Sequence, residues 1–217
     1  MKYKTVIFDF DGTLADTSPS ILSSISFTQE MMGLPEISLE QMYSHIGPPM
    51  EESYNRNFGL TGDDLKKAVQ FHKQYAVEQG YKKIKFYNGI LELVDKLQAS
   101  DINTAIATLK DHSTAVKILE YFNVANKFNV VIGENPGSKM TKSQLLNYCA
   151  EKTDTDKKDC VLIGDSKYDA IGAYESGMDF IGVLYGFGFK TTEEINQFPN
   201  VGIATDVISL SNLLLKK

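Results

Sequence analysis

Two carboxylates stand two residues apart in the segment Asp9-Phe10-Asp11-Gly12. The apolar run before them, Thr5-Val6-Ile7-Phe8, is typical of a buried strand that ends at the edge of a sheet. Gly12 allows the sharp turn that brings side chains at positions i and i+2 to one location. Two unpaired carboxylates this close repel each other, and a divalent cation removes that repulsion. For this segment alone, an acidic loop that caps the next helix is the alternative interpretation.

A second acidic pair, Asp165 and Asp169, follows another apolar run, Val161-Leu162-Ile163. Ligands of open parallel sheets bind just beyond the carboxyl ends of the strands, so both pairs are expected at one edge. Mg²⁺ prefers oxygen ligands, and Asp9, Asp165 and the carbonyl oxygen of Asp11 would suit it. A zinc site is not indicated, because the histidines are scattered along the chain at positions 45, 72 and 112.

A phosphate group near such a cation would need a hydroxyl donor and a positive charge. Thr108 follows the apolar run Thr104-Ala105-Ile106-Ala107, which places its hydroxyl at the same edge. Lys142 opens a helical pattern that continues with Leu145 and Leu146, and it supplies the charge. Taken singly, Thr108 would more often be a strand-to-helix connector and Lys142 a solvated lysine. Their order and placement after the acidic residues favour the phosphate site.

The elements that position these residues alternate between strands and helices. Further strands are predicted at 130–132, 180–183 and 201–204, and helices at 90–97, after Asp111 as N-cap, and at 142–149. A last helix is expected at the C-terminal end. This alternation predicts an α/β fold with a doubly wound, mostly parallel sheet. Residues 15–83 instead show amphipathic helical patterns and no good strand, which predicts an all-helical insertion.

These motifs together resemble the haloacid dehalogenase-like hydrolases, whose four motifs occur here in order. They are DFDGT at 9–13, Thr108, Lys142 and GDSKYD at 164–169. The resemblance covers essentially the whole chain and implies an α/β core of residues 1–14 and 84–217 with a helical cap of residues 15–83. Lys139 is the alternative to Lys142, which is preferred because the residues after it keep the helical pattern.

The resemblance also implies roles for individual residues. Asp9 would attack phosphorus and form an aspartyl-phosphate, and Asp11 would protonate the leaving alcohol and then activate water. Thr108 and Lys142 would bind the phosphoryl oxygens, with Mg²⁺ as the cofactor. Asp165 and Asp169 would lie with Asp9 and Asp11 at the metal. Gly12, Thr13 and Leu109 would contact the substrate. Leu109 stands where many relatives have a small polar residue, and Asn88 precedes Gly89 where the cap hinge often has proline.

Selectivity for the leaving group is expected in the cap. The candidate residues are Gly47 and Pro48, in the segment His45-Ile46-Gly47-Pro48-Pro49, and Arg56, which is the only arginine of the chain. This segment resembles that of phosphoglycolate phosphatases and, in its Ile-Gly-Pro-Pro stretch, that of 5′-nucleotidases. The alternative is that Pro48-Pro49 only begins a helix.

Three other functions stay open at this point. A mutase of the β-phosphoglucomutase type shares the aspartyl-phosphate but returns the phosphoryl group to another hydroxyl. A signalling receiver domain gathers similar residues around Mg²⁺, but it needs only about 120 residues and no insertion. A non-enzymatic binding module is disfavoured because Asp9, Asp11, Lys142 and Asp165 are all present.

Composition excludes several partner classes. The 217 residues include 22 basic and 28 acidic side chains, so the net charge is −6, which disfavours binding to nucleic acid polymers. No apolar run reaches the ~20 residues of a membrane helix, so a cytoplasmic location without membrane association is expected. The expected partner is a small phosphorylated metabolite, and the apolar pattern is compatible with a monomer and with a homodimer.

Overall fold

The computed structural model describes residues 2–135 and 140–215. The chain forms two compact units. The first unit comprises the residues up to Asp16 and those from Phe86 onward, and the second unit is Thr17–Lys85. No helix within the described residues has both the length and the apolar character needed to span a membrane.

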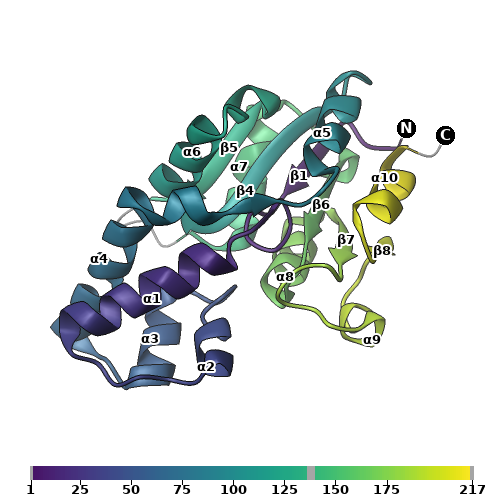
Figure 1. The fold of residues 1–217 in the computed structure, drawn as a ribbon. Coiled ribbons are helices and arrows are strands. Elements are labelled where there is room, and N and C mark those ends of the chain that lie inside the picture. The colour runs from purple at the N-terminus through teal and green to yellow at the C-terminus, as the bar shows by residue number, and fades with distance from the viewer. Residues whose placement is uncertain (1, 136–139, 216–217) are drawn as a thin grey trace. The chain divides into compact units, whose positions relative to one another are not determined.

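A six-stranded parallel sheet forms the centre of the first unit, with strand order β5-β4-β1-β6-β7-β8 (Figure 1). This arrangement confirms the predicted fold class. The N-terminal strand β1 lies between β4 and β6, with Val6 opposite Thr104 on one side and Val161 on the other. The strands are β1 (Thr5–Phe8), β4 (Asn103–Asp111), β5 (Val130–Glu134), β6 (Cys160–Gly164), β7 (Asp179–Val183) and β8 (Gly202–Ala204).

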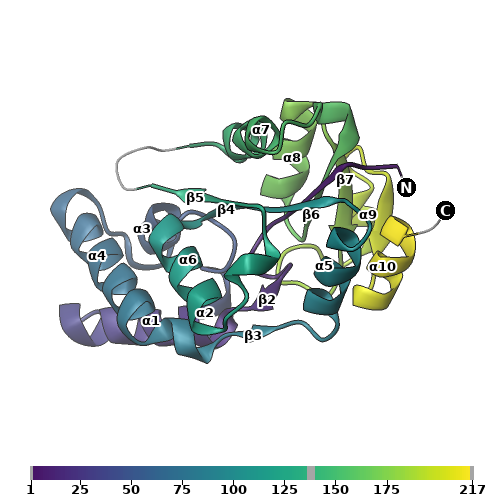
Figure 2. The same cartoon turned by 90° about the horizontal axis from the view of Figure 1, so that it is seen from above.

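Helices cover both faces of this sheet (Figure 2). The helices α7 and α8 pack against one face, and α5, α6 and α10 lie on the other. Apolar side chains of the strands account for this packing, since Ile7 and Leu162 are fully buried. The helical elements are α5 (Ile90–Gln98), α6 (His112–Tyr121), α7 (Lys142–Lys152), α8 (Lys167–Ser176), α9 (Thr192–Ile195) and α10 (Val207–Leu215), with short 3₁₀ turns at Ala125–Lys127 and Lys157–Asp159.

Two helix starts were predicted from single residues, and both are confirmed. The Asp111 carboxylate accepts a hydrogen bond of 3.0 Å from the amide of Thr114 and caps α6. Lys142 is the first residue of α7, where Thr141 forms a capping box with Gln144. The expectation that residues 15–83 contain no strand was wrong at the start of this range. Ala15–Asp16 forms the strand β2, which pairs with β3 (Lys85–Phe86). A two-residue strand is too short to produce a readable alternation.

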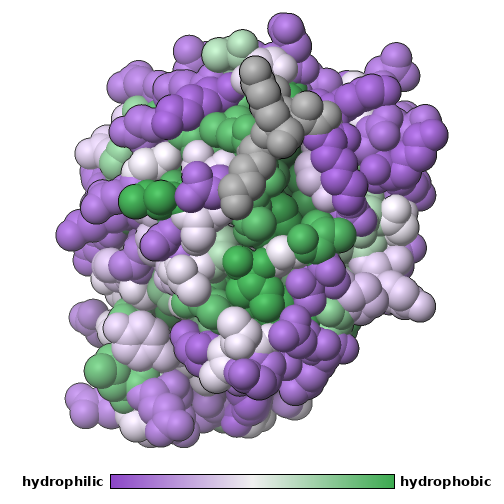
Figure 3. Space-filling view, turned by 90° about the vertical axis from the view of Figure 1, so that its right-hand side faces the viewer, coloured by the Kyte–Doolittle hydropathy of each residue, from purple (hydrophilic) through white to green (hydrophobic). Residues whose placement is uncertain are grey.

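The C-terminal helix α10 buries one side and exposes the other. Val207, Leu210 and Leu214 are buried, whereas Ile208 is 75% and Leu213 39% exposed. Figure 3 shows the face that carries this part of the chain, where hydrophobic side chains gather among hydrophilic ones. The helix therefore packs its buried side chains beside β8 and α5.

The second unit is helical, as predicted for the insertion. Its elements are α1 (Ser18–Met32), α2 (Leu39–Tyr43), α3 (Met50–Phe58), α4 (Gly62–Glu78) and a 3₁₀ turn at Gly80–Lys83. Its interior contains an aromatic group around Tyr54, whose hydroxyl lies 2.9 Å from His72 Nδ1. The ring of His45 packs edge-on against Tyr54, with 5.1 Å between the ring centroids. Burial and, to a smaller extent, the charge of Arg56 together lower the pKa of His45 to about 4.

We expect His45 to make this protein sensitive to mild acid. His45 Nε2 is buried with no hydrogen-bond partner among the described residues, so the protonated ring gains no acceptor in the folded state. The unfolded chain binds the proton with an ordinary pKa near 6.5, so stability falls as the pH drops from there toward 4. His45 should lower the free energy of unfolding by about 2 kcal/mol between pH 7 and pH 5.

Urea unfolding of the wild type and His45→Gln at both pH values measures this effect. The variant should lose less stability on acidification than the wild type. His112→Gln is the matched control, because its ring is partly exposed at the start of α6. An identical loss of stability in the wild type and His45→Gln would contradict the expectation.

Candidate active site

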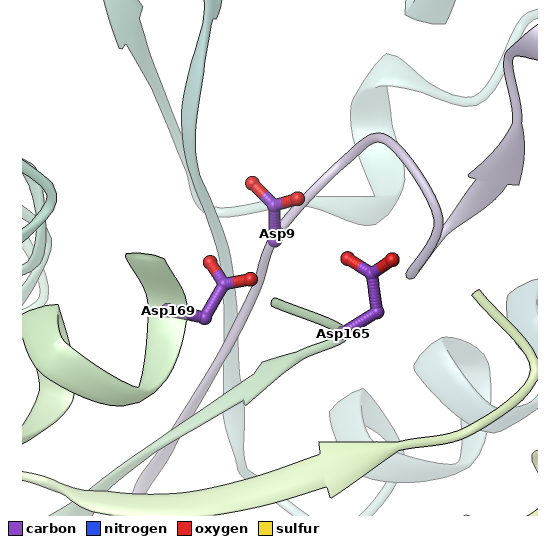
Figure 4. Close-up of side chains that lie close together, drawn as sticks. All are labelled: Asp9, Asp165 and Asp169. Atoms are coloured by element: carbon purple, nitrogen blue, oxygen red, sulfur yellow. The ribbon is translucent and has the colours of Figure 1, made fainter. Parts of the chain in front are cut away.

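The predicted polar residues meet at the carboxyl edge of the sheet. Asp9 follows β1, Asp165 follows β6, and Thr108 lies in the last part of β4. Because β1 is hydrogen-bonded to both β4 and β6, these three positions adjoin. Asp169, from the first turn of α8, completes a group in which one oxygen of each of Asp9, Asp165 and Asp169 lies within 4.8 Å of the others (Figure 4).

Lys142 is the central cation of this group. Its Nζ lies 2.6 Å from Asp9 Oδ1 and 2.7 Å from Asp169 Oδ1, and it donates to the carbonyl oxygen of Ala107 at 2.6 Å. The residue is only 5% exposed. Burial alone would lower its pKa, but Asp169 and Asp9 raise it above its usual range. Lys142 therefore stays charged and holds the two carboxylates beside each other.

The Asp165 carboxylate is held by the loop that follows β7. Its Oδ2 accepts hydrogen bonds from the amides of Phe187 at 2.7 Å and Gly188 at 2.9 Å. This leaves Oδ1 as the oxygen that the loop does not use. A Cβ atom on Gly186 would overlap both Asp165 Oδ2 and the carbonyl oxygen of Gly12, so only glycine permits this approach.

Asp169 is fixed by the start of its own helix. Its Oδ2 accepts hydrogen bonds from the Ser166 amide at 3.1 Å and from the Ser166 hydroxyl at 2.6 Å. These contacts form the capping box of α8. With Lys142 on its other oxygen, Asp169 is engaged on both sides. The supporting role that the family resemblance implies for Asp169 stays a prediction.

Charge is not balanced within this group. Burial raises the pKa of Asp9 to about 7 against the opposing effect of Lys142, and Asp169 and Asp11 add to the rise. Burial also raises the pKa of Asp165 to about 7, with further contributions from Asp169 and Asp9. The carboxylates therefore resist being ionised together without an additional positive charge.

The donor set fits a hard divalent cation. It consists of carboxylate oxygens only. Mg²⁺ and Ca²⁺ prefer oxygen ligands, whereas zinc sites in proteins are mostly built from cysteine and histidine. A cation beside Asp9 and Asp165 would supply the missing positive charge. The described residues thus contain one carboxylate cluster able to hold a metal ion, and it includes three of the four residues predicted at the metal, Asp9, Asp165 and Asp169 but not Asp11.

Asp11 has a different partner, which the sequence did not reveal. The Nζ of Lys110 lies 2.8 Å from Asp11 Oδ1 and 2.9 Å from Oδ2. Thr108 is 2% exposed, and its Oγ1 accepts a hydrogen bond of 3.2 Å from the Lys110 amide. The lysine stands two residues after the predicted threonine, and this spacing is the only signal in the sequence that could have drawn attention to it.

Three further predicted residues surround the turn after β1. Gly12 has a φ of 79°, and a Cβ there would clash with the Asp165 carboxylate. The Thr13 hydroxyl is buried with no partner among the described residues, and its carbonyl oxygen accepts a hydrogen bond of 3.1 Å from the Tyr185 hydroxyl. Leu109, in β4, is partly buried and packs against the hydrophobic core.

The predicted cap residues lie in the second unit. Gly47 has a φ of 101°, and Pro48 precedes Pro49, the N-cap of α3. Arg56 donates to the Ser44 carbonyl oxygen at 2.6 Å and lies 3.6 Å from Glu52. Their role in substrate binding stays a prediction. Lys139, the alternative to Lys142, lies outside the described residues.

Comparisons with known proteins identify the family of this chain and similar folds. The family model described as haloacid dehalogenase-like hydrolase matches residues 6–183. A 5′-nucleotidase from Pseudomonas aeruginosa is 27% identical over 215 residues, which cover 99% of this chain and 96% of the relative. A phosphoglycolate phosphatase from Nitrosospira multiformis is 28% identical over 194 residues, which cover 85% and 84% of the two chains. A crystal structure described as a predicted phosphatase from Clostridium acetobutylicum has a TM-score of 0.90 at 29% identity, over 99% of both chains.

Mg²⁺ should raise the melting temperature of the wild type, because a cation that binds only the folded carboxylate cluster stabilises it. At a concentration 100 times the dissociation constant, the gain would be about 2.7 kcal/mol. Asp165→Asn should lose this gain, and Asp63→Asn, whose side chain is 86% exposed, should keep it. Differential scanning calorimetry with Mg²⁺ or with EDTA measures the shift. An equal shift in wild type and Asp165→Asn would place the ion elsewhere.

Lys142→Met should destabilise the protein by about 3 kcal/mol or more, because it leaves Asp9 and Asp169 buried without their cation. Lys127→Met removes a more exposed pair with Asp95 and should cost about 1 kcal/mol or less. Urea unfolding in EDTA compares the two variants. Equal losses would show that the buried pairs contribute no more than the exposed one.

Proposed function

Because the chain belongs to the haloacid dehalogenase-like hydrolase family, we propose that it is a Mg²⁺-dependent phosphomonoester hydrolase for a small phosphorylated metabolite. The reaction resembles that of phosphoglycolate phosphatases and passes through an aspartyl-phosphate on Asp9. The observation that supports it best is the buried Lys142, which joins Asp9 and Asp169 beside Asp165 at the carboxyl edge of the sheet.

Asp9 is the proposed nucleophile. An oxygen of its carboxylate forms a bond to phosphorus while the bond from phosphorus to the leaving oxygen breaks, and the electron pair of that bond stays on the oxygen. Asp11 gives its proton to this oxygen, so the product leaves as an alcohol. Its place two residues after Asp9, directly before the turn at Gly12, suits this role.

Hydrolysis of the aspartyl-phosphate uses the same two residues. Asp11, now a carboxylate, takes a proton from water as the water oxygen attacks phosphorus. The bond from phosphorus to the Asp9 oxygen breaks, and inorganic phosphate and the free Asp9 carboxylate result. The charge of Lys142 and the hydroxyl of Thr108 stabilise the phosphoryl oxygens throughout, so most of the rate gain comes from positioning and charge.

Asp9, Asp165 and the carbonyl oxygen of Asp11 would hold Mg²⁺, which would neutralise the negative charge between the Asp9 carboxylate and the phosphate. Asp169 would steady this set through Lys142 and Ser166. The chain's own contribution is to keep these carboxylates close together before substrate arrives. The three carboxylates of Asp9, Asp165 and Asp169 against Lys142 leave two negative charges in excess, which one divalent cation balances.

The second unit is proposed to select the leaving group, with Gly47, Pro48 and Arg56 as the contacts. Arg56 already binds the Ser44 carbonyl oxygen and Glu52, so it would offer a substrate only its remaining donors. A 5′-nucleotidase is the second candidate function, because the relative of that name aligns with 99% of this chain.

Phosphate release from a panel of substrates tests this proposal. The panel contains 2-phosphoglycolate, nucleoside 5′-monophosphates, hexose phosphates and a chromogenic aryl phosphate, each with Mg²⁺ or EDTA. We expect Mg²⁺-dependent release from the wild type and a loss of at least about 1000-fold in Asp9→Asn, since the variant lacks the nucleophile. Asp95→Asn, whose carboxylate lies outside the site, is the control.

Two results would contradict the proposal. Release that persists in Asp9→Asn would show that another group attacks phosphorus. Isomerisation of a hexose phosphate without release of phosphate would show a mutase. The substrate with the highest kcat/KM decides between the phosphoglycolate phosphatase and the 5′-nucleotidase.

A further inference from the structure

The ion pair between Lys110 and Asp11 joins two residues that stand far apart in the sequence. The single ammonium group of Lys110 reaches both carboxylate oxygens, at 2.8 and 2.9 Å. The two side chains are 12% and 18% exposed, so water screens the pair only in part. This contact fixes the direction in which the Asp11 carboxylate faces, which a bond to a single oxygen would not do.

The backbone around Lys110 is irregular, and the irregularity determines where its side chain lies. The pairing of β4 with β5 shifts between Ala107 and Asp111, so β4 has more residues there than its neighbour. Gly133 of β5 faces this segment, and a Cβ on Gly133 would lie 2.7 Å from the Lys110 carbonyl oxygen. The glycine therefore allows the close approach that the extra residues of β4 need.

The backbone of Lys110 and the residue that follows it are both anchored. Its amide donates to Thr108 Oγ1 at 3.2 Å. The next residue, Asp111, accepts hydrogen bonds from Thr114 and caps α6. The end of the Lys110 side chain also contacts the residue before Asp11, since Nζ lies 5.9 Å from the centre of the Phe10 ring. The side chain thus extends from a fixed strand end to a fixed turn.

We propose that Lys110 is a positioning residue that orients the Asp11 carboxyl group for proton transfer. The inference rests on the proposed function, in which Asp11 gives its proton to the leaving oxygen as the bond from phosphorus to that oxygen breaks. Lys110 makes and breaks no bond in this step. It binds one lone pair on each oxygen of Asp11, which leaves a second position on each oxygen, one of which carries the proton that Asp11 donates to the leaving oxygen.

A direct contact with the substrate is the competing role for Lys110. An ammonium group at this edge of the sheet would also attract a phosphoryl oxygen, as Lys142 is proposed to do. The two roles differ in what they depend on. Phosphate binding does not depend on the leaving group, whereas assistance from Asp11 matters most when the leaving group is a poor one.

Phenyl phosphate and 2,4-dinitrophenyl phosphate separate these roles. Phenolate is a poor leaving group that needs a proton, and dinitrophenolate leaves without one. The parameter is kcat/KM, which covers the steps up to departure of the leaving group and excludes hydrolysis of the aspartyl-phosphate. Lys110→Met should lower kcat/KM for phenyl phosphate by roughly 10-fold to 100-fold and leave that for dinitrophenyl phosphate within about threefold.

Additional variants keep the test independent of folding. Lys110→Arg should restore most of the activity on phenyl phosphate, because a guanidinium group also binds both oxygens of a carboxylate. Lys127→Met is the matched control, since its ion pair with Asp95 lies outside the site. The melting temperature of each variant shows whether a loss of activity follows from unfolding.

A double-mutant cycle tests whether Lys110 acts through Asp11. On dinitrophenyl phosphate, the Asp11→Asn variant and the Asp11→Asn, Lys110→Met double variant should have the same kcat/KM. On phenyl phosphate, Lys110→Met should have no further effect once Asp11 is replaced. A further loss in the double variant would overturn the proposal.

The remaining outcomes overturn one of the two proposals without the other. Equal losses on both aryl phosphates in Lys110→Met would show that Lys110 binds the phosphoryl group. A loss that Lys110→Arg does not restore, together with a lower melting temperature, would show a structural role. Wild-type turnover that does not depend on Asp9 would instead overturn the proposed function.

Discussion

Repulsion among carboxylates at one sheet edge is the constraint on which the arrangement of this site depends. Asp9, Asp165 and Asp169 place oxygens within 4.8 Å of one another, and burial raises the pKa of both Asp9 and Asp165 to about 7. The fold offsets part of this repulsion with Lys142, which is almost fully buried between Asp9 and Asp169. Removing either partner of such a pair would leave an uncompensated buried charge. The part that remains is what makes the cluster attractive to a divalent cation.

The positions of the acids could be predicted because of a property of parallel sheets. Strands that are far apart in the sequence end at the same edge, so a polar residue directly after a buried apolar run has a known location. Asp9, Asp165 and Thr108 each follow such a run, and β1 lies between β6 and β4 in the sheet. The start of α7 at Lys142 was readable from its helical pattern, and its capping box confirms it. The doubly wound fold class follows from the same alternation of strands and helices.

Two other parts of the site could not be read from side-chain types. Lys110 reaches Asp11 because β4 and β5 shift register beside Gly133, and a shift by one residue would turn the side chain to the opposite face. The groups that hold Asp165 are the backbone amides of Phe187 and Gly188, which carry no side-chain signal. The glycines of that loop are its only trace in the sequence. These glycines allow the loop to approach Asp165, because a Cβ on Gly186 would overlap the Asp165 carboxylate.

The turn after β1 and the loop after β7 form one rigid support. The Tyr185 hydroxyl binds the Thr13 carbonyl oxygen at 3.1 Å, and the rings of Tyr185 and Tyr87 lie edge-on with 4.8 Å between their centroids. Gly12 and Gly186 both pack against Asp165, so neither segment can shift without displacing that carboxylate. The backbone of Asp11 is therefore fixed, and the remaining freedom lies in the rotation of its side chain. Lys110 restricts this rotation, because it binds both oxygens of the carboxylate.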